Sequence, residues 1–153
     1  MTRYATIGSS SIVDLFLEAG RQVAGFEHTV VYSRDQARGE AFAARHGGSA
    51  RVVTGLDALA SADDVDVVYI ASPNAFHHDQ AAAMLAAGKH VLVEKAAASN
   101  AAEFRDLQRV AGEHGTVVVE SIRSLFDPSY AVIEGLLASL GPVRRVTFGY
   151  CQR

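Results

Sequence analysis

Short runs of β-forming residues alternate with longer helical patterns from one end of the chain to the other. Strands that are joined through helices pair in parallel and use right-handed crossovers, so few other arrangements are open to this chain. Six strands are expected, over residues 4–7, 28–32, 51–53, 65–70, 90–93 and 117–119. The spacing of apolar residues predicts helices over residues 11–19, 36–46, 56–61, 76–87 and 100–114. The sequence therefore predicts an α/β fold built on a parallel sheet of six strands.

The run from Val65 to Ile70 is expected to be a central strand, because only Asp66 within it is polar and both of its faces would be buried. In an open parallel sheet, ligands bind beyond the carboxyl ends of the strands. Polar residues follow most of the predicted strands, at 8–11, 33–35, 72–74, 94–95 and 120–121. We therefore expect a binding site along this edge of the sheet.

The chain continues beyond the sixth strand with a helix start at Asp127-Pro128, where Asp is the N-cap and Pro lies in the first turn. An apolar face follows, and Gly141-Pro142 ends the helix. The residues of that face are Ile133, Leu136, Leu137 and Leu140. A last strand is predicted over residues 143–150.

Composition excludes several classes of protein. Of the 153 residues, 49% are apolar and 20% are charged, which is enough apolar surface for one core and excludes disordered and fibrous chains. The net charge of −3 gives no reason to expect nucleic acid or an anionic membrane as a partner. Cys151 is the only cysteine, so no internal disulfide is expected. We also do not expect Cys151 to act as a nucleophile. With no signal peptide or membrane-spanning run, we expect a cytoplasmic protein.

The loop after the first strand is a candidate phosphate-binding turn. Gly8 could make the tight turn, and the backbone N–H groups at the start of the next helix would then face an anion. The dinucleotide fingerprint is incomplete, because Ser10 and Val13 stand where its second and third glycines belong. An ordinary strand–helix turn capped by Ser11 explains the pattern about as well. The candidate cofactor-binding residues here are Gly8, Ser9, Ser10 and Ser11.

The end of the second strand bears on which nucleotide is bound. Ser33 occupies the position where an acidic residue would bind the ribose hydroxyl of NAD. Arg34 and Arg38 follow, and guanidinium groups bind phosphate through two parallel hydrogen bonds. We therefore favour NADP over NAD, although both arginines would also suit a solvated helix surface.

Glu94 and Lys95 end an otherwise apolar strand. A partly desolvated lysine can transfer a proton, because burial and neighbouring charges shift its pKa readily. From the spacing alone, a surface ion pair is the simpler interpretation.

His77, His78 and Asp79 raise the question of a metal site. Adjacent helical residues point about 100° apart and do not converge on one ion. No metal site is therefore expected.

The sequence resembles the N-terminal domain of the Gfo/Idh/MocA oxidoreductases, which include glucose–fructose oxidoreductase and inositol dehydrogenase. The matching segments are Ala5-Thr6-Ile7-Gly8, Tyr32-Ser33-Arg34, Ile70-Ala71-Ser72-Pro73-Asn74 with His77, Ala87-Gly88-Lys89-His90-Val91, Glu94-Lys95, Pro128 and Gly141-Pro142-Val143. The resemblance implies a Rossmann-type doubly wound sheet over residues 1–121. It also implies that residues 122–153 hold a connecting helix and the first strand of a second α/β domain.

The same resemblance implies hydride transfer between a nicotinamide cofactor and a hydroxyl carbon of a sugar or polyol. Lys95 matches the lysine that touches the substrate hydroxyl, with Glu94 orienting it. Asn74 and His77 match residues near the nicotinamide, and Ser72, in the same matching segment, is a further candidate cofactor-binding residue. The complete protein is expected to be a homo-oligomer.

Departures from the family pattern lead to further expectations. Ala96 stands where the family has a proline, so the loop that presents Lys95 should be less constrained. Because the second domain has only begun, we expect a fragment that binds nucleotide but turns over poorly, with Val146, Phe148 and Tyr150 on an exposed apolar edge. The alternatives are a non-catalytic nucleotide-binding module, such as a cofactor sensor or a partner-binding subunit, and a remnant that binds nothing.

Overall fold

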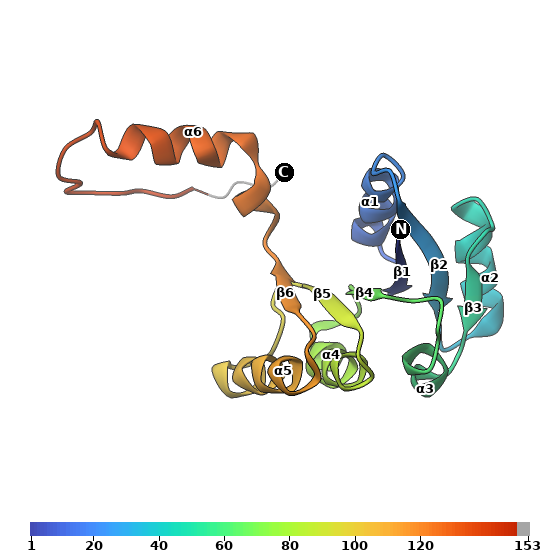
Figure 1. Ribbon diagram of the computed structural model, residues 1–153. Coiled ribbons are helices and arrows are strands. Elements are labelled where there is room, and N and C mark those ends of the chain that lie inside the picture. The colour runs from blue at the N-terminus through green and yellow to red at the C-terminus, as the bar shows by residue number, and fades with distance from the viewer. Residues whose placement is uncertain (150–153) are drawn as a thin grey trace. The chain divides into compact units, whose positions relative to one another are not determined.

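Six parallel strands form one sheet in the order β3-β2-β1-β4-β5-β6, as the computed structural model shows (Figure 1). The structure describes residues 1–149, and it divides into one unit of residues 1–121 and a second unit that begins at Ile122. The strands are β1 (Thr2–Ile7), β2 (Phe26–Tyr32), β3 (Arg51–Val53), β4 (Val67–Ile70), β5 (His90–Glu94) and β6 (Val118–Ser121). The predicted α/β fold with a doubly wound parallel sheet is confirmed.

Helices cover both faces of this sheet (Figure 1). On one face, α1 (Ser11–Gly20) and α2 (Gln36–Arg45) contribute Leu17 and Phe42 to a core with Tyr69. On the other, α3 (Leu56–Ala60), α4 (His77–Ala86) and α5 (Ala101–His114) pack against strand residues that include Ile70. Successive side chains along a strand point to opposite faces, which is why Tyr69 and Ile70 belong to different cores.

β4 lies between β1 and β5, so the prediction of a central strand is confirmed. It begins at Val67, two residues later than expected. The Asp66 carboxylate, just before the strand, pairs with the Arg3 guanidinium at 2.6 Å. Hydrogen bonds from Arg3 lower the pKa of Asp66 to about 2. The one polar residue of the predicted run is thus held at the edge of the core rather than within it.

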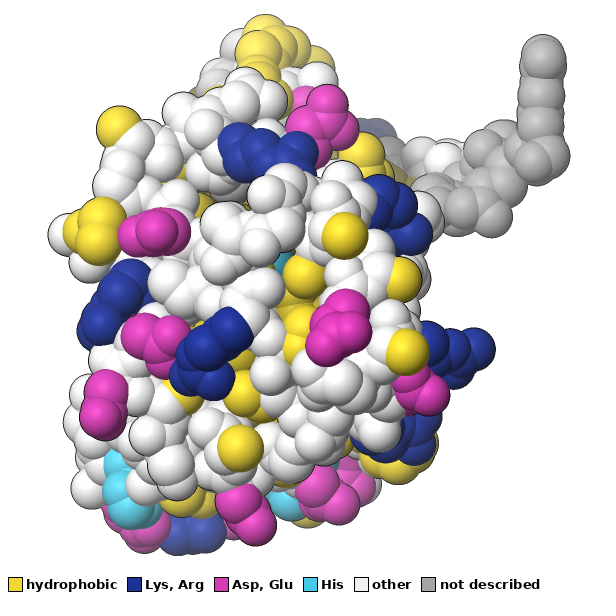
Figure 2. All heavy atoms as spheres, turned by 90° about the vertical axis from the view of Figure 1, so that its right-hand side faces the viewer, with side chains coloured by type: hydrophobic (Ala, Val, Ile, Leu, Met, Phe, Trp, Pro, Cys, Tyr) yellow, Lys and Arg dark blue, Asp and Glu magenta, His cyan; other side chains and the backbone are white. Residues whose placement is uncertain are grey.

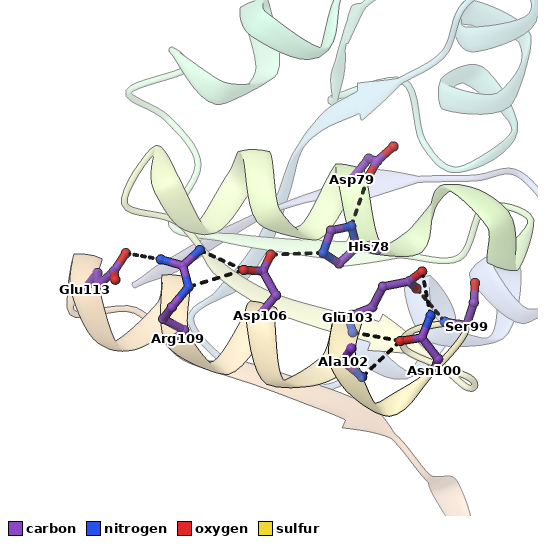
Figure 3. A network of polar contacts seen from close by, with 9 residues as sticks. All are labelled: His78, Asp79, Ser99, Asn100, Ala102, Glu103, Asp106, Arg109 and Glu113. Atoms are coloured by element: carbon purple, nitrogen blue, oxygen red, sulfur yellow. Dashed lines mark hydrogen bonds and ion pairs between the residues drawn. The ribbon is translucent and has the colours of Figure 1, made fainter.

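A polar network joins α4 to α5 on the surface (Figure 3). The ring of His78 contacts Asp79 at 2.9 Å and Asp106 at 3.1 Å, and Asp106 also accepts from Arg109 at 2.7 Å. The hydrogen bond with Asp79, followed by that with Asp106, raises the pKa of His78. At the start of α5, the Asn100 side chain accepts from two backbone N–H groups and caps the helix.

The second unit contains η2 (Arg123–Phe126) and α6 (Pro128–Leu137). The Asp127 carboxylate accepts from Ser129 N at 2.8 Å, so the predicted helix start is confirmed. The strand predicted over 143–150 is wrong for residues 143–149, which have no regular secondary structure, while Tyr150 and Cys151 lie outside the described residues. A strand needs a neighbour to bind its backbone N–H and C=O groups, and β-forming residues alone do not supply one. No helix within residues 1–149 is long and apolar enough to cross a bilayer.

Candidate functional site

A cleft of about 850 Å³ lies at the carboxyl ends of β1, β2 and β4. Its walls are the loop between β1 and α1, the loop between β2 and α2, and the segment after β4. Seven residues predicted from the sequence line it: Gly8, Ser9, Ser10, Ser33, Arg34, Arg38 and Ser72. The tertiary structure thus brings together residues from three separate strand ends.

Gly8 turns the chain from β1 into this cleft with φ +118°, a conformation that side chains rarely adopt. A Cβ at this position would lie 2.5 Å from the carbonyl oxygen of Ala71. The N-cap of α1 is Ser10 rather than Ser11, and its side chain makes no capping bond. The first N–H groups of a helix have no partner within the helix, so this end of α1 can bind an anion.

Hydrogen bonds between residues of the loop after β2 fix the conformation of that loop. The Ser33 hydroxyl donates to the carbonyl oxygen of Asp35 at 2.7 Å, and the Asp35 carboxylate accepts from Arg38 N at 2.9 Å and caps α2. This turn leaves the side chains of Arg34 and Arg38 exposed in the cleft wall. The Arg34 guanidinium lies 5.7 Å from the centre of the Phe76 ring, within the range of a cation–π contact.

The wall also contains residues that were not predicted from the sequence, among them Phe76 and Gln80. Phe76 lies at the end of η1 (Asn74–Phe76), and Gln80 accepts a hydrogen bond from the Ser72 hydroxyl at 2.6 Å. An exposed aromatic residue at a helix start could have drawn attention to Phe76. Nothing in the sequence pattern singles out Gln80, whose contact spans eight residues.

His77 lies behind the wall of the cleft rather than in it. Its ring is fully buried, with Nε2 2.8 Å from the carbonyl oxygen of Ser72 and Nδ1 2.8 Å from that of Ala96. Both ring nitrogens are therefore engaged by backbone groups, and the ring has no surface from which to touch a cofactor. Ser11 and Asn74 are exposed but are not part of the cleft lining.

Glu94 and Lys95 lie at the end of β5, outside the cleft lining. Glu94 accepts a hydrogen bond from the Tyr69 hydroxyl at 2.8 Å, and within the described part of the chain no ion pair joins it to Lys95. Lys95 is exposed, so the partial desolvation expected for it is not present in this chain.

The loop that presents Lys95 is more constrained than the sequence predicts. Ala96 O contacts the His77 ring, and Ala97 N donates to the Glu120 carboxylate at 2.9 Å. Side chains thus restrain this loop even though no proline follows Lys95.

The His77-His78-Asp79 run does not form a ligand set. His77 points into the interior, whereas His78 binds Asp106 on the surface (Figure 3). Among residues 1–149, no group of three or more His, Cys, Asp or Glu side chains is placed to hold a metal ion. On the face in Figure 2, basic and acidic side chains are interspersed and do not form a basic patch.

Comparison with known proteins matches residues 2–121 to the GFO_IDH_MocA oxidoreductase family with an NAD-binding Rossmann fold. The scyllo-inositol 2-dehydrogenase (NADP(+)) IolU of Bacillus subtilis is 41% identical over 152 residues, which are 99% of this chain and 46% of the relative. The uncharacterized oxidoreductase YgjR of Escherichia coli is 35% identical over 152 residues, again 99% of this chain and 46% of the relative.

Among solved structures, the 3-ketoreductase KijD10 of Actinomadura kijaniata, in complex with NADP and TDP-benzene, superposes with a TM-score of 0.84 and 31% identity. The match covers 90% of this chain and 42% of KijD10. The chain therefore spans about half the length of the relatives that it matches.

Proposed function

Because the chain belongs to the Gfo/Idh/MocA oxidoreductase family, we propose that it forms the NADP-binding part of an enzyme that transfers hydride to or from a hydroxyl carbon of a sugar or polyol. In this proposal residues 1–121 bind the cofactor, and the chain from Ile122 onward begins a second α/β domain that completes the substrate site and the contacts of a homo-oligomer. The NADP dependence and the inositol substrate in the name of IolU support the substrate and cofactor classes.

The observation that carries the proposal is the cleft itself. A glycine turn with no room for a Cβ, an uncapped helix start and two exposed arginines meet in one hollow. The pyrophosphate of a dinucleotide would lie at Ser9 and Ser10, where the backbone approaches it and the α1 dipole favours negative charge. Arg34 and Arg38, with Ser33, would hold the 2′-phosphate that distinguishes NADP from NAD.

We expect NADP to bind more tightly than NAD, and Arg34→Ala to weaken NADP binding about 10- to 100-fold, because a hydrogen bond to a charged group contributes about 1.5 to 3 kcal/mol. NAD binding should change by less than about threefold, since NAD has no 2′-phosphate. Calorimetric titration of the purified chain measures both affinities. Arg105→Ala, at an exposed position of α5, is the matched control and should change neither. Tighter binding of NAD than of NADP would contradict the assignment.

Lys95 is the residue proposed to handle the proton of the reaction. When bound, the nicotinamide supplies the hydride acceptor or donor. In the oxidative direction, the Lys95 amine takes the proton of the substrate hydroxyl as its O–H bond breaks and the carbonyl forms, and in the reductive direction it returns that proton. Glu94, which accepts a hydrogen bond from the Tyr69 hydroxyl, is the residue before Lys95 and would orient it.

In the complete enzyme, Lys95→Met is expected to lower kcat by about 10²- to 10⁴-fold, the usual contribution of a positioned acid or base. NADP affinity measured by titration should stay unchanged, because Lys95 lies outside the cleft lining. Turnover of scyllo-inositol with NADP(+) is a suitable assay, given the activity named for the relative IolU. Retention of turnover in the variant would rule out this role.

A non-catalytic nucleotide-binding module is the second candidate, and one observation favours it. Lys95 is exposed to solvent, so the partial desolvation that would favour a proton-transfer group is not present at this position. A complete protein that binds NADP but turns over no sugar or polyol would select this alternative.

A further inference from the structure

We propose that His77 and Glu120 grip the peptide group between Ala96 and Ala97 from its two sides and thereby position Lys95. The inference rests on the proposed function, because a positioning role has meaning only if Lys95 acts on the substrate. Neither His77 nor Glu120 is expected to touch the cofactor or substrate. Each is a positioning residue that acts through the backbone.

The grip is formed by two hydrogen bonds to one peptide group. His77 Nδ1 lies 2.8 Å from the carbonyl oxygen of Ala96, and the N–H of Ala97 donates to Glu120 Oε1 at 2.9 Å. The C=O and N–H of a trans peptide group point in opposite directions, so the two side chains hold it from opposite sides. One comes from α4 and the other from β6, two elements separated in the chain by β5 and α5.

This arrangement is partly buried, and its bonds reinforce one another. His77 is fully buried and Ala97 is 2% exposed, whereas Glu120 is half-buried and Ala96 is exposed. A carboxylate accepting from N–H makes a charge-assisted bond, and bonds at the two ends of one peptide group polarise each other. We therefore expect this peptide group to be among the most rigid in the loop.

His77 also ties the grip to the cofactor cleft. Its Nε2 lies 2.8 Å from the carbonyl oxygen of Ser72, and Ser72 is part of the cleft wall. Both partners of the ring are carbonyl oxygens, which accept, so each contact requires an N–H on the ring nitrogen that faces it. Through these two contacts, the His77 ring connects the Ser72 segment to the Ala96-Ala97 peptide group.

The consequence for Lys95 follows from its exposure. An exposed side chain has few neighbours to hold it, so its position depends on the backbone that presents it. On one side of Lys95, Glu94 is fixed by the Tyr69 hydroxyl. On the other side, the gripped peptide group begins at Ala96. These contacts restrain the loop at the position where the family has a proline.

Glu120 offers the sharper test, because one substitution keeps the contact and another removes it. In Glu120→Gln the side-chain oxygen can still accept from Ala97 N, whereas Glu120→Met has a similar length and no acceptor. Amide hydrogen exchange, followed by NMR on this chain, reports on the Ala97 N–H directly. We expect Glu120→Met to accelerate that exchange by about tenfold or more, and Glu120→Gln by less than about threefold. Glu18→Met, an exposed site on α1, is the control and should leave it unchanged.

The functional half of the test uses the complete enzyme with scyllo-inositol and NADP(+) as probes. Glu120→Met is expected to lower kcat about tenfold, in line with the cost of a small misplacement of a reacting group, and to leave the Kd for NADP unchanged. Glu120→Gln should restore kcat to within about threefold of the wild type. Combined with Lys95→Met, Glu120→Met should have no further effect, because both act through the same side chain.

The outcomes separate this inference from the proposed function. Unchanged Ala97 exchange in Glu120→Met would overturn the grip itself, whatever the enzyme does. Faster exchange with unchanged kcat, or an additive loss in the double variant, would overturn the positioning of Lys95. Full turnover in Lys95→Met would overturn the proposed function and the positioning of Lys95 with it, while the exchange result would still decide whether the grip exists.

Discussion

Replacing Gly8 by alanine is expected to lower the free energy of unfolding by about 3 kcal/mol, the combined cost of a strained backbone and an overpacked contact. The new Cβ would lie 2.5 Å from the carbonyl oxygen of Ala71 and 2.8 Å from its carbonyl carbon. Both are backbone atoms of the residue after β4, whose N–H donates to the carbonyl oxygen of Ile7 at 2.8 Å, so they cannot rotate away as a side chain could. The positive φ of Gly8 adds strain even if the clash is relieved.

The same variant should lose NADP binding, because relief of the clash must move the loop that would hold the pyrophosphate. Urea denaturation measures the stability, and calorimetric titration measures the binding. Gly112→Ala is the matched control, since the position is inside α5 and an added Cβ would have open space beyond the backbone of its own helix. It is expected to stabilise the chain by about 1 kcal/mol, the difference in helix propensity. Wild-type stability in Gly8→Ala would show that the loop does not need glycine.

Acidification from pH 7 to pH 5 is expected to lower the free energy of unfolding by about 2 kcal/mol through His28 alone. Burial, with small contributions from His46 and Arg21, lowers the pKa of His28 to about 4 from 6.5. Between these values the unfolded chain takes up a proton that the folded chain does not, so stability is full above pH 6.5 and declines as the pH falls towards 4. The half-buried ring stacks on Tyr4 with centroids 5.1 Å apart and contacts the Thr6 hydroxyl at 3.1 Å.

The variant His28→Gln isolates this contribution. It cannot titrate, so its stability should change by less than about 1 kcal/mol between pH 7 and pH 5 through the remaining groups. His78 acts in the opposite sense, because its raised pKa adds stability at low pH, and it is the same in both proteins. Urea denaturation of the two proteins at both pH values gives the difference. Parallel losses in wild type and variant would remove His28 as the cause.

Most of the fold could be predicted from the sequence because each element has a local signal. The apolar run around Val68 marks the central strand, Asp127-Pro128 marks a helix start, and the glycines after α2, α4 and α5 mark helix ends. Residues 143–149 do not follow their local signal. Their sequence favours a strand, yet a strand exists only where a neighbour satisfies its backbone, and local sequence does not contain that neighbour.

The candidate site was predictable in part for a similar reason. Residues directly after strands, such as Gly8, Arg34 and Ser72, could be placed in the cleft because parallel strands end at one edge. Gln80 and Glu120 could not, since each meets its partner only through the packing of helices and strands. His77 matched the family motif, but its burial behind the cleft wall is a property of the folded chain.

The sequence by itself determined the class of the fold, the strand ends at which a nucleotide would bind, and the family. These follow from periodicity and from short motifs, which are local along the chain. Only the tertiary structure decided that His77 faces inward to two carbonyl groups, that Lys95 is exposed, and that Glu120 holds the peptide group beyond Ala96. The contacts of His77 with Ala96 and of Glu120 with Ala97 join residues 19 and 23 positions apart, so they form only when the sheet is assembled.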